Sequence, residues 1–376
     1  MLYLTSAGEE VDDAVDLLRV VALAAALSVA LALAILLRRL WLRRRGIPPI
    51  RFLSDHVELP LGATSRTVRR VRYGEILALS AVGAGPATRL LIDTARHSFI
   101  FPAAAFATPD GMQRAGQSLA AHLDTLPDRS EIRTRLQQRQ EWGRRFLARP
   151  APATRALVGL ILALSIVQWV LLPAEISLAV LERGANVAEL LWQGQWFRLV
   201  TANLLHVNWI HALSNAGFAW VIGQHVERQF GSGRLLILAL ATGPLSMLAS
   251  AMAMSALQPF AYSIGASGAL CGLLGAQAAF TWIHGARLPG LFRIPPRALG
   301  LLLLVNFVVL PLLIPQIDVA AHLGGLVAGF AVALVWCRAD GGILERPTLS
   351  RFERALFGLL AVGWLAGLAT AFGYGP

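Results

Sequence analysis

The sequence predicts an all-α polytopic membrane protein that carries a small β-rich domain near its N-terminus. Of its 376 residues, 56% are hydrophobic and 15% are charged, whereas charged residues make up about 25% of soluble domains. Apolar runs close to the ~20 residues needed to cross the hydrocarbon core recur along most of the chain. A long polar interval separates the first run from the others, which predicts a cytosolic domain between membrane spans.

Residues 1–45 are predicted to form an N-terminal transmembrane helix, with its apolar run at 17–37. Acidic residues precede this run and arginines follow it, so the positive-inside rule places its N-terminus outside and its C-terminus in the cytoplasm. The acidic residues are atypical of a cleaved signal or transit peptide. We therefore expect this span to stay attached.

Residues 46–128 are predicted to be a small cytosolic α+β domain of unknown role. Hydrophobicity alternates with period two at 66–78 and 89–101, and a helical period follows at 110–126. Its arginines favour either contact with anionic lipid or a solvated basic face. A charged helical linker is expected at 129–154.

Residues 155–376 contain seven further predicted spans. Arginine-bearing connections alternate with connections that lack basic residues, as one consistent topology requires. The long connection 173–198 is expected outside; its content of Leu, Ile, Val and Trp favours a position in the membrane interface. The spans are placed near 156–172, 207–226, 235–254, 267–283, 301–314, 319–336 and 355–372.

The charge and the cysteines exclude several functions. The net charge of +11 comes from arginines that flank apolar spans, so it indicates membrane orientation and not nucleic-acid binding. Cys271 and Cys337 lie within or at the end of apolar runs, which predicts neither a disulfide framework nor a zinc site.

Ser267 is the first candidate for chemistry, at the outer mouth of an apolar helix between Gly265 and Gly268. Glycine lets backbone and substrate approach closely, and a helix N-terminus offers unpaired N–H groups to an oxyanion. The alternative is that Gly268, Gly272 and Gly275 pack membrane helices together without any catalysis.

His322 is the second candidate, because an imidazole inside a hydrophobic span is costly and marks a functional position. It lies one turn in from the outer end of its helix, at the depth predicted for Ser267. Gly325 and Gly329 form a small-residue face that allows close packing on the Ser267 helix. The hydroxyl and imidazole would then lie within hydrogen-bond reach, as nucleophilic catalysis requires.

His206, His211 and Asn215 form a third polar cluster at the same depth. His211 and Asn215 are one helical turn apart on one face, where both can donate to an oxyanion beside Ser267. The alternative is a polar network that only holds helices together.

These motifs resemble the rhomboid family of intramembrane proteases, and the resemblance covers about residues 156–372. The order of motifs is that of the family: His-x-x-x-Asn, then Gly-x-Ser-x, then His. Further matches are a Trp-Arg-like signature at 196–198 and a loop at 227–233. The motifs read His211-Ala212-Leu213-Ser214-Asn215, Gly265-Ala266-Ser267-Gly268 and Ala321-His322-Leu323-Gly324-Gly325.

The resemblance implies a Ser267–His322 dyad, with an oxyanion hole formed by the Ser267 backbone N–H, His211 and Asn215. Supporting glycines are Gly265, Gly268, Gly325 and Gly329. One departure is Cys271, where some relatives carry a tyrosine that stacks on the histidine. Asp318 is interpreted as a helix cap and not as a third catalytic member.

The resemblance also implies a rhomboid-like bundle, with a six-helix core plus one C-terminal helix, in a bacterial inner membrane. Its substrates would be transmembrane proteins in the lipid bilayer, cut near the outer face through an acyl-enzyme in a cavity open to water. The resemblance implies that this cleavage needs no metal and no other cofactor. Two alternatives stay open: a non-proteolytic rhomboid-like factor that binds membrane proteins, and a small-solute transporter, against which the lack of an internal repeat speaks. The oligomeric state and the substrate are left open.

Overall fold

The computed structural model describes most of the chain and divides it into two compact units, Met1–Glu141 and Trp142–Pro376. The division falls inside the segment predicted to be a linker. The predicted N-terminal helix at 1–45 lies outside the described residues. These are 48–62, 65–82, 88–94, 97–108, 110–172, 179–180, 182–257, 262–285, 296–314, 317–339 and 348–373.

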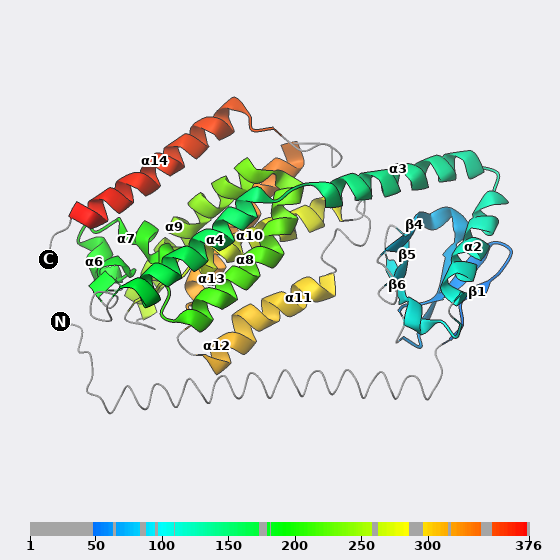
Figure 1. The fold of residues 1–376 in the computed structure, drawn as a ribbon, viewed down its shortest axis with the longest axis horizontal. Helices are drawn as coiled ribbons and strands as arrows, with labels where there is room; N and C mark the ends of the chain where they lie inside the picture. Colours follow the sequence, from blue (N-terminus) through cyan, green and yellow to red (C-terminus); the bar gives the residue numbers. More distant parts are fainter. Residues whose placement is uncertain are drawn as a thin grey trace. The chain divides into compact units, whose positions relative to one another are not determined.

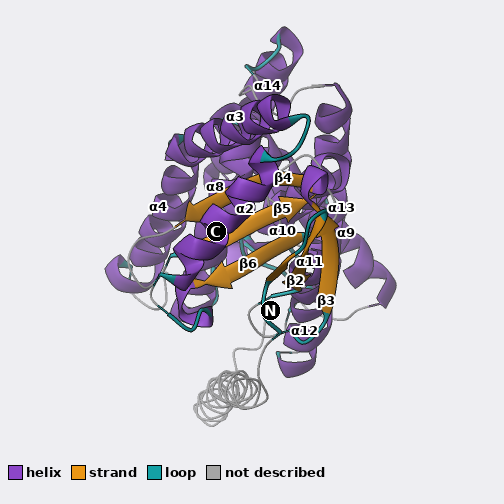
Figure 2. Cartoon of the chain, turned by 90° about the vertical axis from the view of Figure 1, so that its right-hand side faces the viewer, coloured by secondary structure: helices purple, strands orange, loops and turns teal. Residues whose placement is uncertain are grey.

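The first unit contains two antiparallel three-stranded sheets, in the orders β1-β2-β3 and β4-β5-β6. Helix α2 (Gly111–Asp124) lies against the strands (Figure 2). Its Leu119 and Leu123 are buried in a core shared with strand residues. The strands are β1 (Arg51–Phe52), β2 (His56–Pro60), β3 (Val68–Arg72), β4 (Ile76–Val82), β5 (Arg89–Thr94) and β6 (Ser98–Pro102).

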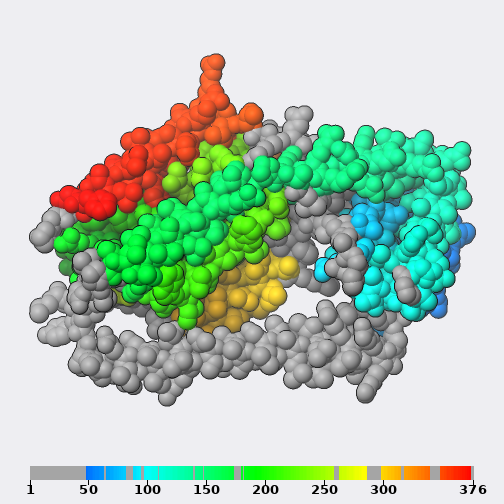
Figure 3. Space-filling view, in the orientation of Figure 1, coloured from blue at the N-terminus to red at the C-terminus, as the bar shows by residue number. Residues whose placement is uncertain are grey.

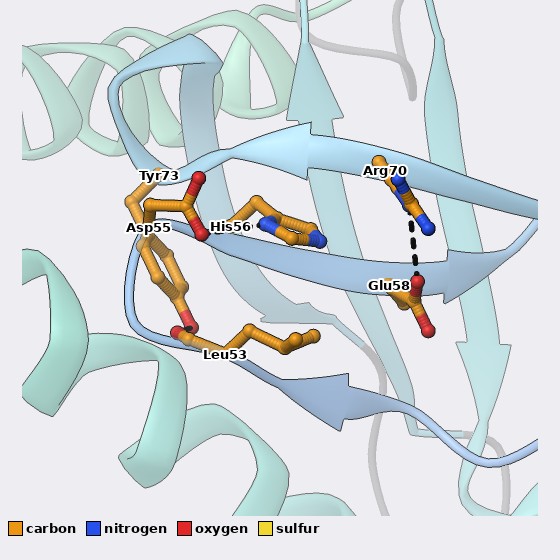
Figure 4. A network of polar contacts seen from close by, with 6 residues as sticks. All are labelled: Leu53, Asp55, His56, Glu58, Arg70 and Tyr73. Atoms are coloured by element: carbon orange, nitrogen blue, oxygen red, sulfur yellow. Dashed lines mark hydrogen bonds and ion pairs between the residues drawn. The ribbon is translucent and has the colours of Figure 1, made fainter.

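The stretch predicted at 66–78 comprises β3, a 3₁₀ turn at Tyr73–Glu75 and the start of β4. Val71 is buried in the core, and Arg70 on the opposite face of β3 donates to Glu58 of β2 at 3.2 Å (Figure 4). Tyr73 is buried, and its hydroxyl donates to the Leu53 carbonyl at 2.7 Å, which fixes the turn against the chain after β1. Alternation thus identified the strands but not the turn that divides them.

Helix α3 (Arg129–Ala148) covers the helical part of the predicted linker. In the first unit, Arg135 donates to the Ile76 carbonyl at 3.1 Å and Gln140 to the Leu79 carbonyl at 2.6 Å. An edge strand presents unpaired carbonyls that template pairing with other chains. These two side chains cover that edge of β4, so α3 has a structural role beyond spacing.

The second unit is helical, and a helix covers each of the seven predicted spans. Two helices contain π-helical turns, at Val167–Leu171 and Val305–Val309. The elements are α4 (Pro152–Ile166), α6 (Ala188–Trp192), α7 (Arg198–Thr201), α8 (Trp209–Phe230), α9 (Ser232–Leu257), α10 (Ser267–His284), α11 (Pro296–Leu304), α12 (Leu310–Leu313), α13 (Val319–Ala339) and α14 (Arg351–Gly373).

Four described helices are long and apolar enough to cross a membrane: Pro152–Leu171, Ser232–Leu257, Val319–Arg338 and Arg351–Gly373. The protein is therefore an integral membrane protein, and the predicted class, a helical membrane bundle with a small β domain before it, is confirmed. Helices α8 and α10 carry more polar residues, among them Asn215 and Gln277, and the α11–α12 helix is shorter. Membrane crossing by these three stays a prediction.

Helices α9, α10 and α13 pack against one another at the centre of the second unit (Figure 1). At the contact between α10 and α13, glycines replace side chains on both helices. A β-carbon built on Gly325 would collide with the Gly268 carbonyl, and one on Gly329 with the Gly272 carbonyl. Only glycine permits this approach, so the small-residue faces recognised in the sequence do bring these two helices into backbone contact.

Helix α14 is held to the bundle by a buried ion pair. Arg234 of α9 donates to Glu353 of α14 at 2.6 Å, and both side chains are buried. The guanidinium also lies 4.9 Å from the centre of the Trp336 ring. Further along, the Trp364 indole donates to the Leu240 carbonyl at 2.8 Å.

Candidate active site

Ser267 and His322 lie together although 55 residues separate them in the sequence; the distance from Ser267 Oγ to His322 Nε2 is 2.8 Å. Ser267 is the first residue of α10, and His322 lies in the first turns of α13. The glycine contact between these helices places one backbone against the other. With the ring proton on Nδ1, the serine hydroxyl donates to Nε2, which is the arrangement required of a general base.

Gly265 shapes the backbone that leads into Ser267. Its φ is 117°, in the left-handed region that side chains avoid. Its N–H donates to the Ala202 carbonyl at 2.8 Å. A β-carbon here would lie 2.6 Å from His211 Cε1, so glycine is required both by conformation and by the close approach of the imidazole.

His211 and Asn215 of α8 both lie against this turn. A β-carbon on Gly265 would be 2.8 Å from His211 Nε2 and 3.6 Å from Asn215 Nδ2. Asn208 caps α8 by accepting from the His211 backbone N–H at 2.9 Å, which fixes the first turn of the helix. Buried Asn215 Nδ2 has no hydrogen-bond partner among the described residues. An unpaired donor beside the serine is available to a substrate oxygen.

His206 is buried, with its ring edge-on to that of His211 at 5.1 Å between centroids. Its backbone carbonyl accepts from Gln168 Nε2 at 3.2 Å and from Trp169 Nε1 at 3.0 Å. Both donors lie in the π-helical turn that ends α4. Sequence reasoning missed them; a glutamine next to a tryptophan at the end of an apolar span was the available signal.

The His322 ring also has an aromatic neighbour from another helix. Phe307, in the π-helical turn between α11 and α12, lies edge-on to it at 6.3 Å between centroids. Asp318 Oδ1 accepts from the Ala321 N–H at 2.8 Å, and its carbonyl accepts from the His322 N–H. Asp318 therefore caps the start of α13.

Cys271, one turn after Ser267, is buried with a free thiol. Gly268, between them, faces Ser246 of α9 as well as the Ala321 carbonyl of α13. Together with the contacts to Gly325, these neighbours enclose the first turn of α10. The helix end that carries Ser267 is thus fixed by packing on two sides.

The connection between α4 and α8 is anchored by Arg198. Its buried side chain donates to the Glu182 and Ala185 carbonyls at 3.0 and 2.6 Å, and to Gln195 Oε1 at 2.8 Å. Trp192 and Trp196 of this connection are half exposed. Exposed indoles are typical of the membrane interface.

The fold and this arrangement define a class: a helical membrane protein with a serine–histidine pair between two glycine-packed helices. A rhomboid domain model matches residues 193–339. The chain is 30% identical over 185 residues to the putative rhomboid protease YdcA of Bacillus subtilis, covering 48% of this chain and 87% of that protein. The chain belongs to the rhomboid family.

Other relatives are longer than the matched region. The rhomboid protease GluP of Bacillus subtilis is 32% identical over 182 residues, which are 48% of this chain and 34% of that protein. RHOMBOID-like protein 5 of Arabidopsis thaliana is 32% identical over 155 residues, 40% of this chain and 48% of that protein. The chain thus spans between a third and half of the length of these two relatives.

Proposed function

We propose that the protein is an intramembrane serine endopeptidase that cleaves transmembrane substrates through a Ser267–His322 dyad. The observation that carries the proposal is the 2.8 Å distance between Ser267 Oγ and His322 Nε2, which joins two helices whose sequences each carry a family motif. Relatives named as rhomboid proteases support the same activity.

In the proposed reaction, His322 takes the Ser267 proton while the serine oxygen attacks a peptide carbonyl of the substrate. The negative charge that develops on the carbonyl oxygen is stabilised by the backbone N–H of Ser267, by Asn215 Nδ2 and by His211. His322 then gives the proton to the leaving amine, and water hydrolyses the acyl-enzyme. The supporting role of Gly265, Gly268, Gly325 and Gly329 is to let these groups approach closely.

We further propose that this end of the helices opens to water on the external side of a bacterial cytoplasmic membrane. Hydrolysis needs water, and polar groups at membrane depth are tolerated where they line a water-filled cavity. The arginine-bearing ends of α8 and α13 would then face the cytoplasm, as the positive-inside rule requires. In this proposal, residues 1–45 add a transmembrane helix, 46–128 a cytosolic domain, 129–154 a charged linker and 155–376 the protease domain.

A serine-directed fluorophosphonate probe, combined with cleavage of a transmembrane substrate in liposomes, tests the proposal. We expect labelling and cleavage by the full chain, and loss of both in Ser267→Ala. The matched control is Ser165→Ala, which removes a buried hydroxyl that only donates to its own helix, at the Ile161 carbonyl. Labelling that persists in Ser267→Ala, or folded protein that neither labels nor cleaves, would contradict the proposal and favour a binding role.

A further inference from the structure

A basic cavity of about 230 Å³ lies at the other end of α8 from the serine–histidine pair. Arg228 follows His211 by 17 residues, which is about 26 Å along a helix. Trp220, Gln224 and Arg228 line the cavity from one face of α8, since each is one turn beyond the last. Arg155, in the first turn of α4, and Arg149, just before α4, complete its basic lining.

The cavity lies where α4 and α8 pack against each other, and these two helices run side by side at the surface of the second unit (Figure 3). Backbone and side chains fix the arginines at its mouth. Arg149 Nη1 donates to the Arg228 carbonyl at 2.9 Å, and Arg228 Nε donates back to the Arg149 carbonyl at 3.3 Å. Arg228 Nη2 also donates to Gln224 Oε1 at 3.1 Å. Arg149 and Arg228 are therefore held in place before any ligand binds, which lowers the cost of binding.

Glu227, next to Arg228 in the sequence, is bonded to groups other than these arginines. Glu227 is buried and accepts from the Ala153 N–H at 2.9 Å, the Thr154 N–H at 2.7 Å and Ser232 Oγ at 2.6 Å. It thus caps α4. Among the residues that the structure describes, neither Arg155 nor Arg228 forms an ion pair, so their charge is available to an anion.

The aromatic and apolar neighbours place the cavity at a membrane interface. Trp220 is 47% exposed, and the next residue of α8, Val221, is 59% exposed. Tryptophan is enriched at the headgroup level, and arginine extends its charged end from apolar surface into the same layer. A lipid whose chains lie along α8 would present its headgroup to the arginines.

We propose that this cavity binds the phosphate group of an anionic lipid in the leaflet opposite the serine–histidine pair. Guanidinium groups form strong charge-assisted hydrogen bonds with phosphate, and basic pockets between transmembrane helices bind anionic headgroups. The site acts independently of proteolysis, since none of its residues belongs to the proposed catalytic machinery.

Native mass spectrometry of the delipidated full-length protein, titrated with phosphatidylglycerol, phosphatidylcholine or inorganic phosphate, tests this site. We expect saturable binding of phosphatidylglycerol, at least about tenfold weaker in Arg155→Gln/Arg228→Gln because each arginine contributes to anionic-lipid binding. The matched control is Arg351→Gln, which removes an exposed arginine from the first turn of α14. It should leave binding unchanged.

Two results would overturn the lipid site: phosphatidylcholine that binds as tightly as phosphatidylglycerol, or Arg351→Gln that weakens binding as much as the double variant. Inorganic phosphate that occupies the site as tightly as the lipid would show a soluble phosphate ligand and refute the lipid source. Arg155→Gln alone guards against misfolding, because Arg155 is exposed and the described residues give its side chain no hydrogen bond. It should weaken phosphatidylglycerol binding while serine labelling stays at the level of the unmodified chain.

Discussion

The two ends of the second unit differ in how their buried charged and polar groups are bonded. At the arginine-bearing end, Glu227 accepts several hydrogen bonds and Glu353 pairs with Arg234. At the serine end, Asn215 Nδ2 and His211 Nδ1 are buried without a hydrogen-bond partner among the described residues. Gln229 of α8 also lacks a partner among the described residues, so an unpaired atom does not mark a site by itself. At the serine end, the side chains of Asn215 and His211 also lie against the turn that leads into Ser267, where a substrate group can satisfy them.

The comparison separates two kinds of variant. Loss of the buried carboxylate of Glu227 or Glu353 at the arginine-bearing end should lower stability and spare the activity of each folded molecule. Loss of a catalytic or oxyanion-binding side chain at the serine end should lower activity and spare stability.

The largest effect is expected from His322→Ala, which removes the proposed general base. We expect kcat to fall at least about 10³-fold, with little further loss in the double variant with Ser267→Ala, because residues that act as one unit are not additive. Cleavage of a transmembrane substrate in liposomes measures kcat, and thermal unfolding provides the control. A second, multiplicative loss in the double variant would contradict a shared step.

The next effect is expected from Glu353→Gln, which removes the buried carboxylate to which Arg234 donates at 2.6 Å. Breaking a buried pair from one side costs about 3–5 kcal/mol, so we expect a lower free energy of unfolding and detachment of α14 at lower denaturant concentration. Arg351→Gln, on the exposed face of the same helix turn, is the control and should have little effect. Activity per folded molecule should stay unchanged. A fall in kcat without a loss of stability would contradict the structural role of Glu353.

The sequence predicted the parts of this site that depend on residue type and spacing. Gly325 and Gly329 stand one turn apart in an apolar span, and that pattern alone predicts a close helix contact. A serine between glycines and a histidine within a span were likewise sufficient to predict which two helices meet. Whether these residues catalyse a reaction stays a prediction until activity is measured.

The parts that the sequence did not predict depend on distant contacts. Strands β1 and β2 are short, and Val57 and Leu59 are the only apolar alternation that β2 offers before Pro60. Gln168 and Trp169 donate to the His206 carbonyl from a π-helical turn. The spacing of hydrophobic residues along the chain does not predict such a turn. Such contacts join segments that are distant in the sequence, and the local pattern of neither segment predicts the contact.

Removing the proposed oxyanion donor Asn215 should lower activity about as much as the loss of one donor from other oxyanion holes. Asn215→Ala deletes the amide that lies against Gly265, and we expect kcat to fall about 10²–10³-fold. The control is Thr370→Ala, which removes a hydroxyl that donates to the Ala366 carbonyl of its own helix, α14. Unchanged thermal unfolding in Asn215→Ala would support a role of Asn215 in activity alone. A marked loss of stability would assign Asn215 a structural role.

The smallest effect is expected from Gly325→Ala, which should lower both stability and activity. The added methyl group meets the Gly268 carbonyl, so the α10–α13 contact must open. Overpacking of this kind costs about 1–3 kcal/mol. The same displacement moves His322 away from Ser267, so stability and kcat should fall together.

Gly358→Ala on α14 is the matched control, since nothing lies within 4 Å of the added atom. A helical Gly→Ala change of this kind should stabilise by about 0.5–1 kcal/mol. Loss of stability with an unchanged kcat in Gly325→Ala would mean that the pair does not depend on the glycine contact.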